Sequence, residues 1–107
     1  MSQILSVDDA SFEAEVAQHA LPALVDFWGD HCPACIQISP ILAAVAAAYD
    51  GRVRVIKIHA AENPATSARY GIRAMPTILA FRGDQVVGQL VGARPKSDFT
   101  ELADRLL

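Results

Sequence analysis

Two cysteines, Cys32 and Cys35, are the residues whose type and spacing point most directly to chemistry. They are the only cysteines among 107 residues, and two positions separate them, so their sulfurs can meet. They follow the strongly apolar run 23–28 and open a long helical pattern that starts near Pro33. In a chain with no other cysteine, a Cys-x-x-Cys pair at a strand-to-helix junction predicts a dithiol–disulfide redox pair.

The start of a helix favours a reactive thiol. Its unpaired N–H groups and the positive end of its dipole both stabilise the thiolate, which is the nucleophile in disulfide exchange. We therefore expect Cys32, at the mouth of the helix, to attack a substrate. Cys35, one turn further and more buried, would resolve the mixed disulfide.

Two other uses of the pair are less favoured. A zinc site normally needs four ligands, and besides acids only His19, His31 and His59 remain, none with a companion at ligand spacing. The sequence thus predicts no metal and no other cofactor for a monomer, and a cluster shared between two chains ranks lower still. A purely structural disulfide ranks last, because so short a loop removes little unfolded-state entropy.

Composition narrows the class of protein. A length of 107 residues fits one compact domain, and 52% hydrophobic against 20% charged residues predicts a folded chain. The net charge of −3, without a basic run, argues against nucleic acid as the main partner. No apolar stretch would span a bilayer, and residues 1–6 lack a signal-peptide pattern. We expect a cytoplasmic protein, where such a pair is mostly reduced and suits catalysis.

The elements that must position the pair alternate between strand and helix. The patterns predict strands over residues 3–7, 24–28 and 53–59, with a helix capped by Asp8 or Asp9 and running to about residue 19. Helices follow over 33–49, kinked at Pro40, and over 64–70. A hairpin of strands 77–81 and 85–91 precedes a last helix that Ser97 caps and that ends at residue 106. This order predicts an α/β fold, a mixed sheet with helices on both faces.

Five further segments give the chain a strong resemblance to the thioredoxin family over nearly its whole length. In chain order they are Val25-Asp26-Phe27-Trp28, Ser39-Pro40-Ile41-Leu42, Tyr70-Gly71-Ile72-Arg73, Met75-Pro76-Thr77 and Val91-Gly92-Ala93. The resemblance implies a single domain over residues 1–107 with the thioredoxin fold: a mixed sheet of four to five strands flanked by about four helices. It implies a thiol–disulfide oxidoreductase that acts on protein disulfides and takes electrons from a thioredoxin reductase.

The chain departs from the family pattern at the reactive end. His31 stands where the family usually has Trp, Pro33-Ala34 where it has Gly-Pro, Ile36 where it has Lys, and Ala61 where it has Asp. These departures bear on the direction of the reaction and on its partners rather than on the fold.

Asp26 is a candidate general base. It lies in the middle of an apolar strand, where burial should raise its pKa, so it could take the proton of Cys35 through a water. The family resemblance implies the same role. The alternative is a structural acid paired with a base, for which Lys57 in the next buried strand is the obvious partner; both can hold together.

A platform for an extended substrate segment is expected around the pair. Its predicted members are Trp28, Ile36, Ala74, Met75, Gly92 and Ala93. The resemblance implies that Met75–Pro76 is a cis peptide facing the cysteines, where Pro76 would present the Met75 backbone to the substrate and keep metals off the thiolates. Without the resemblance, Pro76 would be a strand-start proline and Trp28 core packing.

His31, placed beside this platform, has two interpretations. A surface histidine is most often simply solvated, and that interpretation is slightly favoured. Next to Cys32, a protonated His31 could instead lower the thiol pKa at mildly acidic pH.

The dipeptide between the cysteines predicts a shifted redox potential. Pro33 suits the first helical position, and Ala34 keeps an N–H that can point at the Cys32 sulfur. An added hydrogen bond to the thiolate stabilises the reduced state, so we expect a couple more oxidising than that of ordinary thioredoxin.

Two other functions compete with a disulfide reductase. The departures at His31, Ile36 and Ala61 would suit a partner-binding or chaperone module that keeps the fold. A glutaredoxin-like activity on glutathione is weaker, because its site normally needs cations near the cysteines and Ile36 removes one. Cys32→Ser separates these functions, since only a binding module would survive it.

Overall fold

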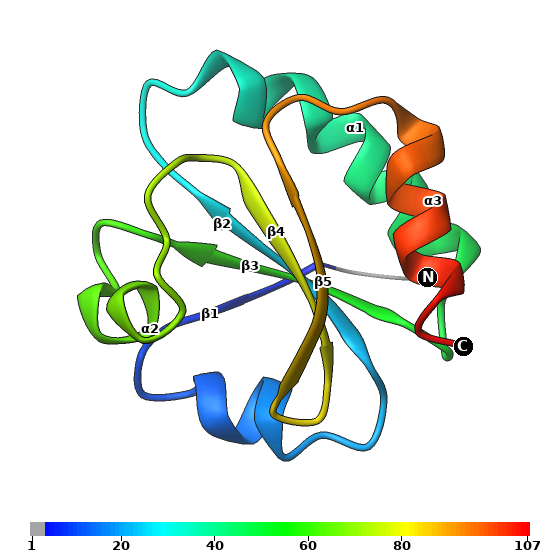
Figure 1. Ribbon diagram of the computed structural model, residues 1–107, viewed down its shortest axis with the longest axis horizontal. Helices are drawn as coiled ribbons and strands as arrows, with labels where there is room; N and C mark the ends of the chain where they lie inside the picture. The colour runs from blue at the N-terminus through cyan, green and yellow to red at the C-terminus, as the bar shows by residue number, and fades with distance from the viewer. Residues whose placement is uncertain (1–3) are drawn as a thin grey trace.

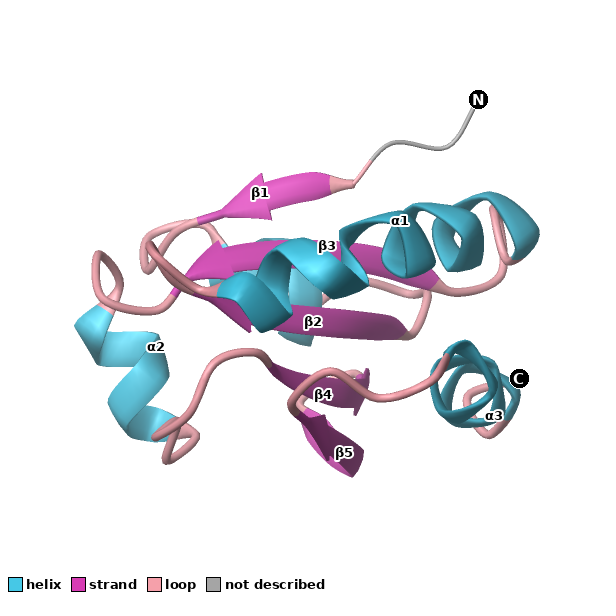
Figure 2. Cartoon of the chain, turned by 90° about the horizontal axis from the view of Figure 1, so that it is seen from above, coloured by secondary structure: helices cyan, strands magenta, loops and turns pink. Residues whose placement is uncertain are grey.

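The computed structural model describes residues 4–107, in which five strands form one sheet. The strands are β1 (Leu5–Val7), β2 (Ala23–Trp28), β3 (Arg54–His59), β4 (Thr77–Arg82) and β5 (Gln85–Val91). Their order across the sheet is β1–β3–β2–β4–β5, which can be followed from top to bottom in Figure 2. β3 pairs parallel with β1 and β2, whereas β4 pairs antiparallel with β2 and β5. The expected mixed sheet is confirmed.

Helices cover both faces of this sheet. They are α1 (Pro33–Ala48), α2 (Pro64–Arg69), α3 (Lys96–Asp104) and the short π-helical η1 (Glu13–Ala17). α1 and α3 lie together on one side, with η1 and α2 towards the other (Figure 1). No helix within residues 4–107 has the length and apolar character that crossing a membrane requires.

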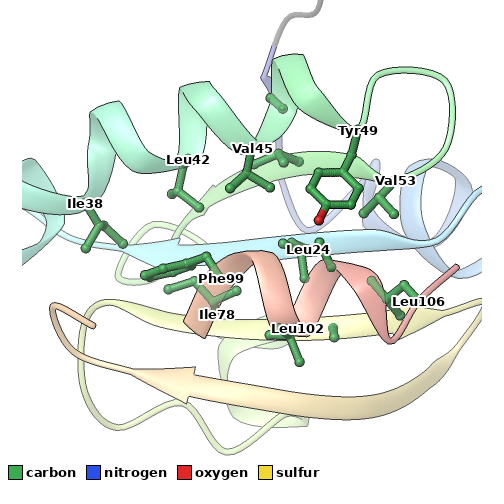
Figure 3. Close-up of a cluster of buried hydrophobic side chains, with 14 residues drawn as sticks. Leu24, Ile38, Leu42, Val45, Tyr49, Val53, Ile78, Phe99, Leu102 and Leu106 are labelled. Atoms are coloured by element: carbon green, nitrogen blue, oxygen red, sulfur yellow. The ribbon is translucent and has the colours of Figure 1, made fainter. Parts of the chain in front are cut away.

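A hydrophobic core fills the space between the sheet and each helical layer. The core beneath α1 and α3, drawn in Figure 3, has as its largest fully buried members Leu24, Ile38, Leu42, Ile78, Phe99 and Leu102. The second core, on the opposite face, includes Phe12, Val16, Val25, Phe27, Ile56, Ile58 and Phe81. Since side chains alternate along a strand, Asp26 and Trp28 point to the face that α1 covers.

The helix expected from Asp8 or Asp9 to about residue 19 is wrong in extent. Only residues 12–17 are helical, the last five of them forming η1. The Asp8 carboxylate accepts the Ser11 N–H at 2.8 Å and holds a turn. The Asp9 carboxylate accepts the N–H groups of Ala65 and Thr66, so it caps α2 instead of its own segment. A cap used by a distant helix cannot be identified from local sequence.

The expected cap of the last helix is also wrong. α3 begins at Lys96, one residue before Ser97, and no side chain caps it. Asp98 lies in its first turn and pairs with Arg94 at 2.9 Å, which places negative charge at the positive end of the helix. The helix ends at Asp104 rather than 106. The other elements match their predicted ranges within a residue or two, and residue 3 of the first predicted strand lies outside the described residues.

Candidate active site

The two cysteines form a disulfide at the N-terminus of α1. Their Cα atoms are 5.3 Å apart, Cys32 is the N-cap residue, and Pro33 occupies the first helical position. The Cys35 N–H, rather than that of Ala34, donates to Cys32 Sγ at 3.2 Å. Both cysteines are half-buried, so the expected contrast in burial between them is not apparent. The pair nevertheless lies at a helix start, where a backbone donor reaches its first sulfur.

A cis peptide between Met75 and Pro76 faces this sulfur, as the family resemblance implied. The carbonyl oxygen of Met75 lies 3.6 Å from Cys32 Sγ. The Gly92 N–H donates to the Pro76 carbonyl at 2.9 Å, which brings Gly92 and the following Ala93 to the same loop. Two segments far apart in sequence therefore border the disulfide.

The loop before the cis peptide is held by local contacts. Thr77 Oγ1 donates to the Ala74 carbonyl at 2.6 Å. Met75 is 42% exposed, and its side chain leans over Gly29, where an added Cβ would lie 3.3 Å from Met75 Cε. The absence of a side chain at Gly29 therefore makes room for an apolar side chain beside the cysteines.

A pocket of about 320 Å³ is lined by both cysteines of the disulfide. Seven predicted site residues line it: Asp26, Trp28, His31, Cys32, Cys35, Ile36 and Lys57. The other five, Ala74, Met75, Pro76, Gly92 and Ala93, do not line the pocket, although the Met75 side chain lies against Gly29, which does. The predicted site is thus divided into a pocket and a loop surface that share Cys32.

Asp26 lies at the bottom of the pocket with 2% of its surface exposed. Its Oδ1 has no hydrogen-bond partner among the described residues. Burial raises the pKa of Asp26 to about 6, although the positive charge of Lys57 acts in the opposite direction. An acid with this pKa can both hold and release a proton near neutral pH.

Lys57 stands beside Asp26 in the sheet register, as the structural interpretation of Asp26 required. Its ammonium lies 5.4 Å from the centre of the Trp28 ring, over the face of the indole. Lys57 makes no close ion pair among residues 4–107. The cation therefore acts on Asp26 through space while it rests on Trp28.

The two residues that flank the cysteines and differ from the family pattern are both exposed, but one is polar and the other apolar. His31 is exposed in the left-handed region, at a φ of 51°, which histidine tolerates better than most side chains. Ile36 is 74% exposed, the highest value among the large hydrophobic residues described. The departure further along the chain, Ala61, is exposed and lies beyond the end of β3. Ile36 thus gives the rim of the pocket an apolar side chain.

Two residues near the pocket were not anticipated from sequence. Asp30 lines the pocket, and its carboxylate meets His59 Nε2 at 3.1 Å. The His59 ring lies edge-on to the Trp28 ring, with 4.6 Å between centroids. His59 follows Lys57 by two positions in β3, so period-two alternation places both on the face of Asp26 and Trp28. That alternation was the one signal in the sequence for His59.

Comparisons with known proteins agree with this geometry. The sequence model of the thioredoxin family matches residues 3–105. A thioredoxin of Synechocystis sp. is 40% identical over 107 residues, which is all of both chains. A thioredoxin of Haemophilus influenzae is 40% identical over 97% of this chain and 94% of its own. One of Allochromatium vinosum is 44% identical over 94% of each chain.

Such similarity over the full length extends to function. Thioredoxins are thiol–disulfide oxidoreductases that act on protein disulfides and have a reductase as partner, and the Cys32–Cys35 disulfide supplies the pair that this chemistry needs. The mixed five-stranded sheet with helices on both faces is the thioredoxin fold. The chain belongs to the thioredoxin family, and it is a thiol–disulfide oxidoreductase.

Proposed function

We propose that Cys32 is the attacking cysteine and Cys35 the resolving one, in a protein that exchanges two electrons with protein disulfides. The observation that carries this assignment is the position of Cys32 Sγ. It is the sulfur at the N-cap of α1, it accepts a backbone N–H, and it lies against the exposed cis-peptide loop. A substrate segment can reach that loop from solvent.

The proposed exchange proceeds in two displacements. The Cys32 thiolate attacks one sulfur of the substrate disulfide, whose S–S bond breaks, and the leaving thiolate takes a proton from water. The Cys35 thiol then loses its proton and attacks Cys32 Sγ. The mixed disulfide breaks, the Cys32–Cys35 disulfide forms, and the second substrate thiol leaves. The protein dithiol has lost two electrons, and the substrate disulfide has gained them.

Asp26 is proposed as the acceptor of the Cys35 proton. Asp26 and Cys35 line one pocket, which is large enough for the water that would carry the proton between them. With a pKa of about 6, the Asp26 carboxylate is mostly ionised at neutral pH and can accept a proton. Lys57 is proposed to assist, because its positive charge favours the ionised form of the Asp26 carboxyl group.

The substrate is proposed to be an extended segment of another protein. Pro76 would fix the Met75 backbone for pairing with that segment, and Ala74, Gly92 and Ala93 would border it. Trp28, His31 and Ile36 would contact its other side. The exposed side chains of Ile36 and Met75, 74% and 42% exposed, favour apolar residues next to the substrate disulfide.

The couple is proposed to be more oxidising than that of ordinary thioredoxin. In the reduced form the Ala34 N–H would join that of Cys35 at the Cys32 thiolate. One such charge-assisted bond is worth roughly 1.4 kcal/mol, or about 30 mV for a two-electron couple. Equilibration in defined dithiol–disulfide buffers measures the potential. Ordinary thioredoxin has a potential of about −270 mV, a general reference value rather than one derived for this chain, and a result at or below it would contradict this part of the proposal.

The decisive experiment compares Cys32→Ser with Cys35→Ser in the reduction of insulin disulfides by dithiothreitol. Both variants should lose turnover, and Cys35→Ser alone should accumulate a mixed disulfide with substrate, because its attacking thiol remains. Mixed disulfide on Cys35 in the Cys32→Ser variant would reverse the assignment. Function that persists in cells carrying Cys32→Ser would instead favour a partner-binding module.

The setting of this activity is proposed on chemical grounds. A thioredoxin reductase would supply the electrons, and the cytoplasm, where such pairs stay mostly reduced, would be the compartment. The chain would work as a monomer and as one domain over residues 1–107, without a cofactor of its own. Sedimentation of the purified protein tests the monomer.

A further inference from the structure

His59 is a partly buried polar side chain near the site that the exchange reaction leaves without a role. Only 10% of its side chain is exposed. Its Nδ1 accepts the Glu62 N–H at 3.2 Å, and its Nε2 lies 3.1 Å from Asp30 Oδ2. Because Nδ1 is the acceptor, the neutral ring carries its proton on Nε2 and donates to the Asp30 carboxylate. Both ring nitrogens are therefore bonded.

These bonds connect two parts of the active site. Asp30 belongs to the loop between β2 and Cys32, whereas Glu62 follows β3. The His59 backbone is held as well, since Asn63 Nδ2 donates to its carbonyl at 2.9 Å. The ring thus ties the loop that carries the first cysteine to a strand in the middle of the sheet.

The same ring also fixes Trp28. Its edge meets the indole at an interplanar angle of 83°, and Lys57 lies over the indole face 5.4 Å from the ring centre. In the register of β2 and β3, Trp28 pairs with His59 and Asp26 with Lys57. Trp28 is therefore confined by two side chains of β3, one of which acts on the buried acid.

We propose that His59 is a positioning residue of the redox site: it anchors the loop before Cys32 through Asp30 and holds Trp28 against Lys57. This inference rests on the redox role of the cysteine pair. Three charged groups face this region: Asp30 from the loop after β2, Glu62 from the turn after β3, and Lys57 from β3 itself. Among them, Asp30 alone combines a contact with His59 and a place in the wall of the pocket.

Three variants separate positioning from general packing. His59→Ala removes both hydrogen bonds of the ring and its contact with Trp28. His59→Asn keeps an acceptor near the Nδ1 position but is too short for Asp30, whereas His59→Gln reaches the Nε2 position and can donate to Asp30. Trp28 is the only tryptophan of the chain, so fluorescence anisotropy reports its freedom directly. Far-UV circular dichroism and the thermal midpoint check that each variant folds.

We expect the two amide variants, His59→Asn and His59→Gln, to differ in both rate and anisotropy. His59→Ala and His59→Asn should reduce insulin disulfides about fivefold more slowly, a modest loss for a misplaced reacting group, and should lower the anisotropy of Trp28. His59→Gln should recover most of the rate through the Asp30 contact and only part of the anisotropy, because an amide replaces the ring edge against Trp28. Parent values in His59→Asn, or equal losses in His59→Asn and His59→Gln at equal thermal midpoints, would overturn the role of the Asp30 contact.

The anisotropy also separates this inference from the proposed function. If the parent protein failed to reduce disulfides, the redox assignment would fail, yet the anisotropy of Trp28 would still show whether His59 confines it. Asp30→Asn is the matched change on the other partner. It should reproduce part of the loss seen in His59→Asn, and an unchanged rate and anisotropy would count against the proposed anchor.

Discussion

Ile36 shows at the scale of one residue how the rim of the site can select a partner. Its side chain lines the pocket beside Cys32 and is 74% exposed, where the family usually has a lysine. An apolar side chain so exposed gains by contact with apolar groups of a substrate, and it offers no attraction to acidic ones. We therefore expect this side chain, more than the cysteines, to influence the choice between these substrates.

Replacing Ile36 by Lys should change substrate preference more than overall reactivity. We expect Ile36→Lys to raise the rate with disulfide peptides that carry acidic residues by about two- to fivefold and to lower it with apolar ones, as expected for one exposed charge pair. The salt dependence should rise in parallel. Gln37→Lys, one exposed position further along α1, is the control for added charge. Equal effects from both variants would show that position 36 has no special place.

The sequence could predict those site residues that local patterns of neighbouring residues mark. Cys32, Cys35 and Asp26 are identifiable because the helix start and the apolar strand are local patterns. His59 was not, because its role depends on Asp30 and Trp28, which are about thirty residues away and meet it only across the sheet. Residues that act through a neighbouring strand become visible once the register is known.

At the scale of elements, Asp9 holds together two segments far apart in the chain. Its carboxylate accepts the N–H of Thr66 at 2.9 Å and that of Ala65 at 3.2 Å, and its own N–H donates to Asn63 Oδ1 at 2.8 Å. α2 has only six residues and no cap from its own N-cap side chain, so a remote carboxylate satisfies its first donors. These hydrogen bonds lower the pKa of Asp9.

Asp9→Ala should therefore lower the thermal midpoint, and Asp9→Asn, which keeps one acceptor, should lower it less. Asp8→Ala is the control, because its carboxylate serves only the local turn at Ser11. Since the pKa of Asp9 is lowered on folding, its contribution is present above the unfolded value of about 3.9 and is lost in more acidic solution. A destabilisation by Asp9→Ala that stayed the same at pH 2 would rule out the charged cap.

The same contacts explain which elements could be predicted. Strands β2 and β3 and helix α1 are specified by their own apolar patterns, and their bounds were found to within a residue or two. The segment from Asp8 to residue 19 resembles a capped helix, but Asp9 caps α2 and Asp8 holds only the local turn at Ser11, so the helical stretch stays short. Local pattern predicts an element well when its caps come from its own neighbours.

At the scale of the whole molecule, the proposed base Asp26 opposes the stability of the fold. Its pKa rises from 3.8 to about 6 on folding, which corresponds to about 3 kcal/mol. Between these two values the folded state binds more protons than the unfolded state. The free energy of unfolding should therefore fall as pH rises from about 4 to about 6, and then level off. Asp9 has the opposite sign and acts only in more acidic solution.

Asp26→Ala tests this balance between stability and exchange. At pH 7.5 it should raise the free energy of unfolding by about 2–3 kcal/mol, the cost of the buried charge less a small loss of packing. The gain should vanish near pH 4, where the acid is neutral in both states. Denaturant unfolding at the two pH values measures it, with Asp50→Ala, an exposed acid at the end of α1, as control.

Exchange should slow at neutral pH because the Cys35 proton has lost its acceptor. A variant that is less stable and equally fast would show that Asp26 is a structural acid, and the resolving step would then need another base.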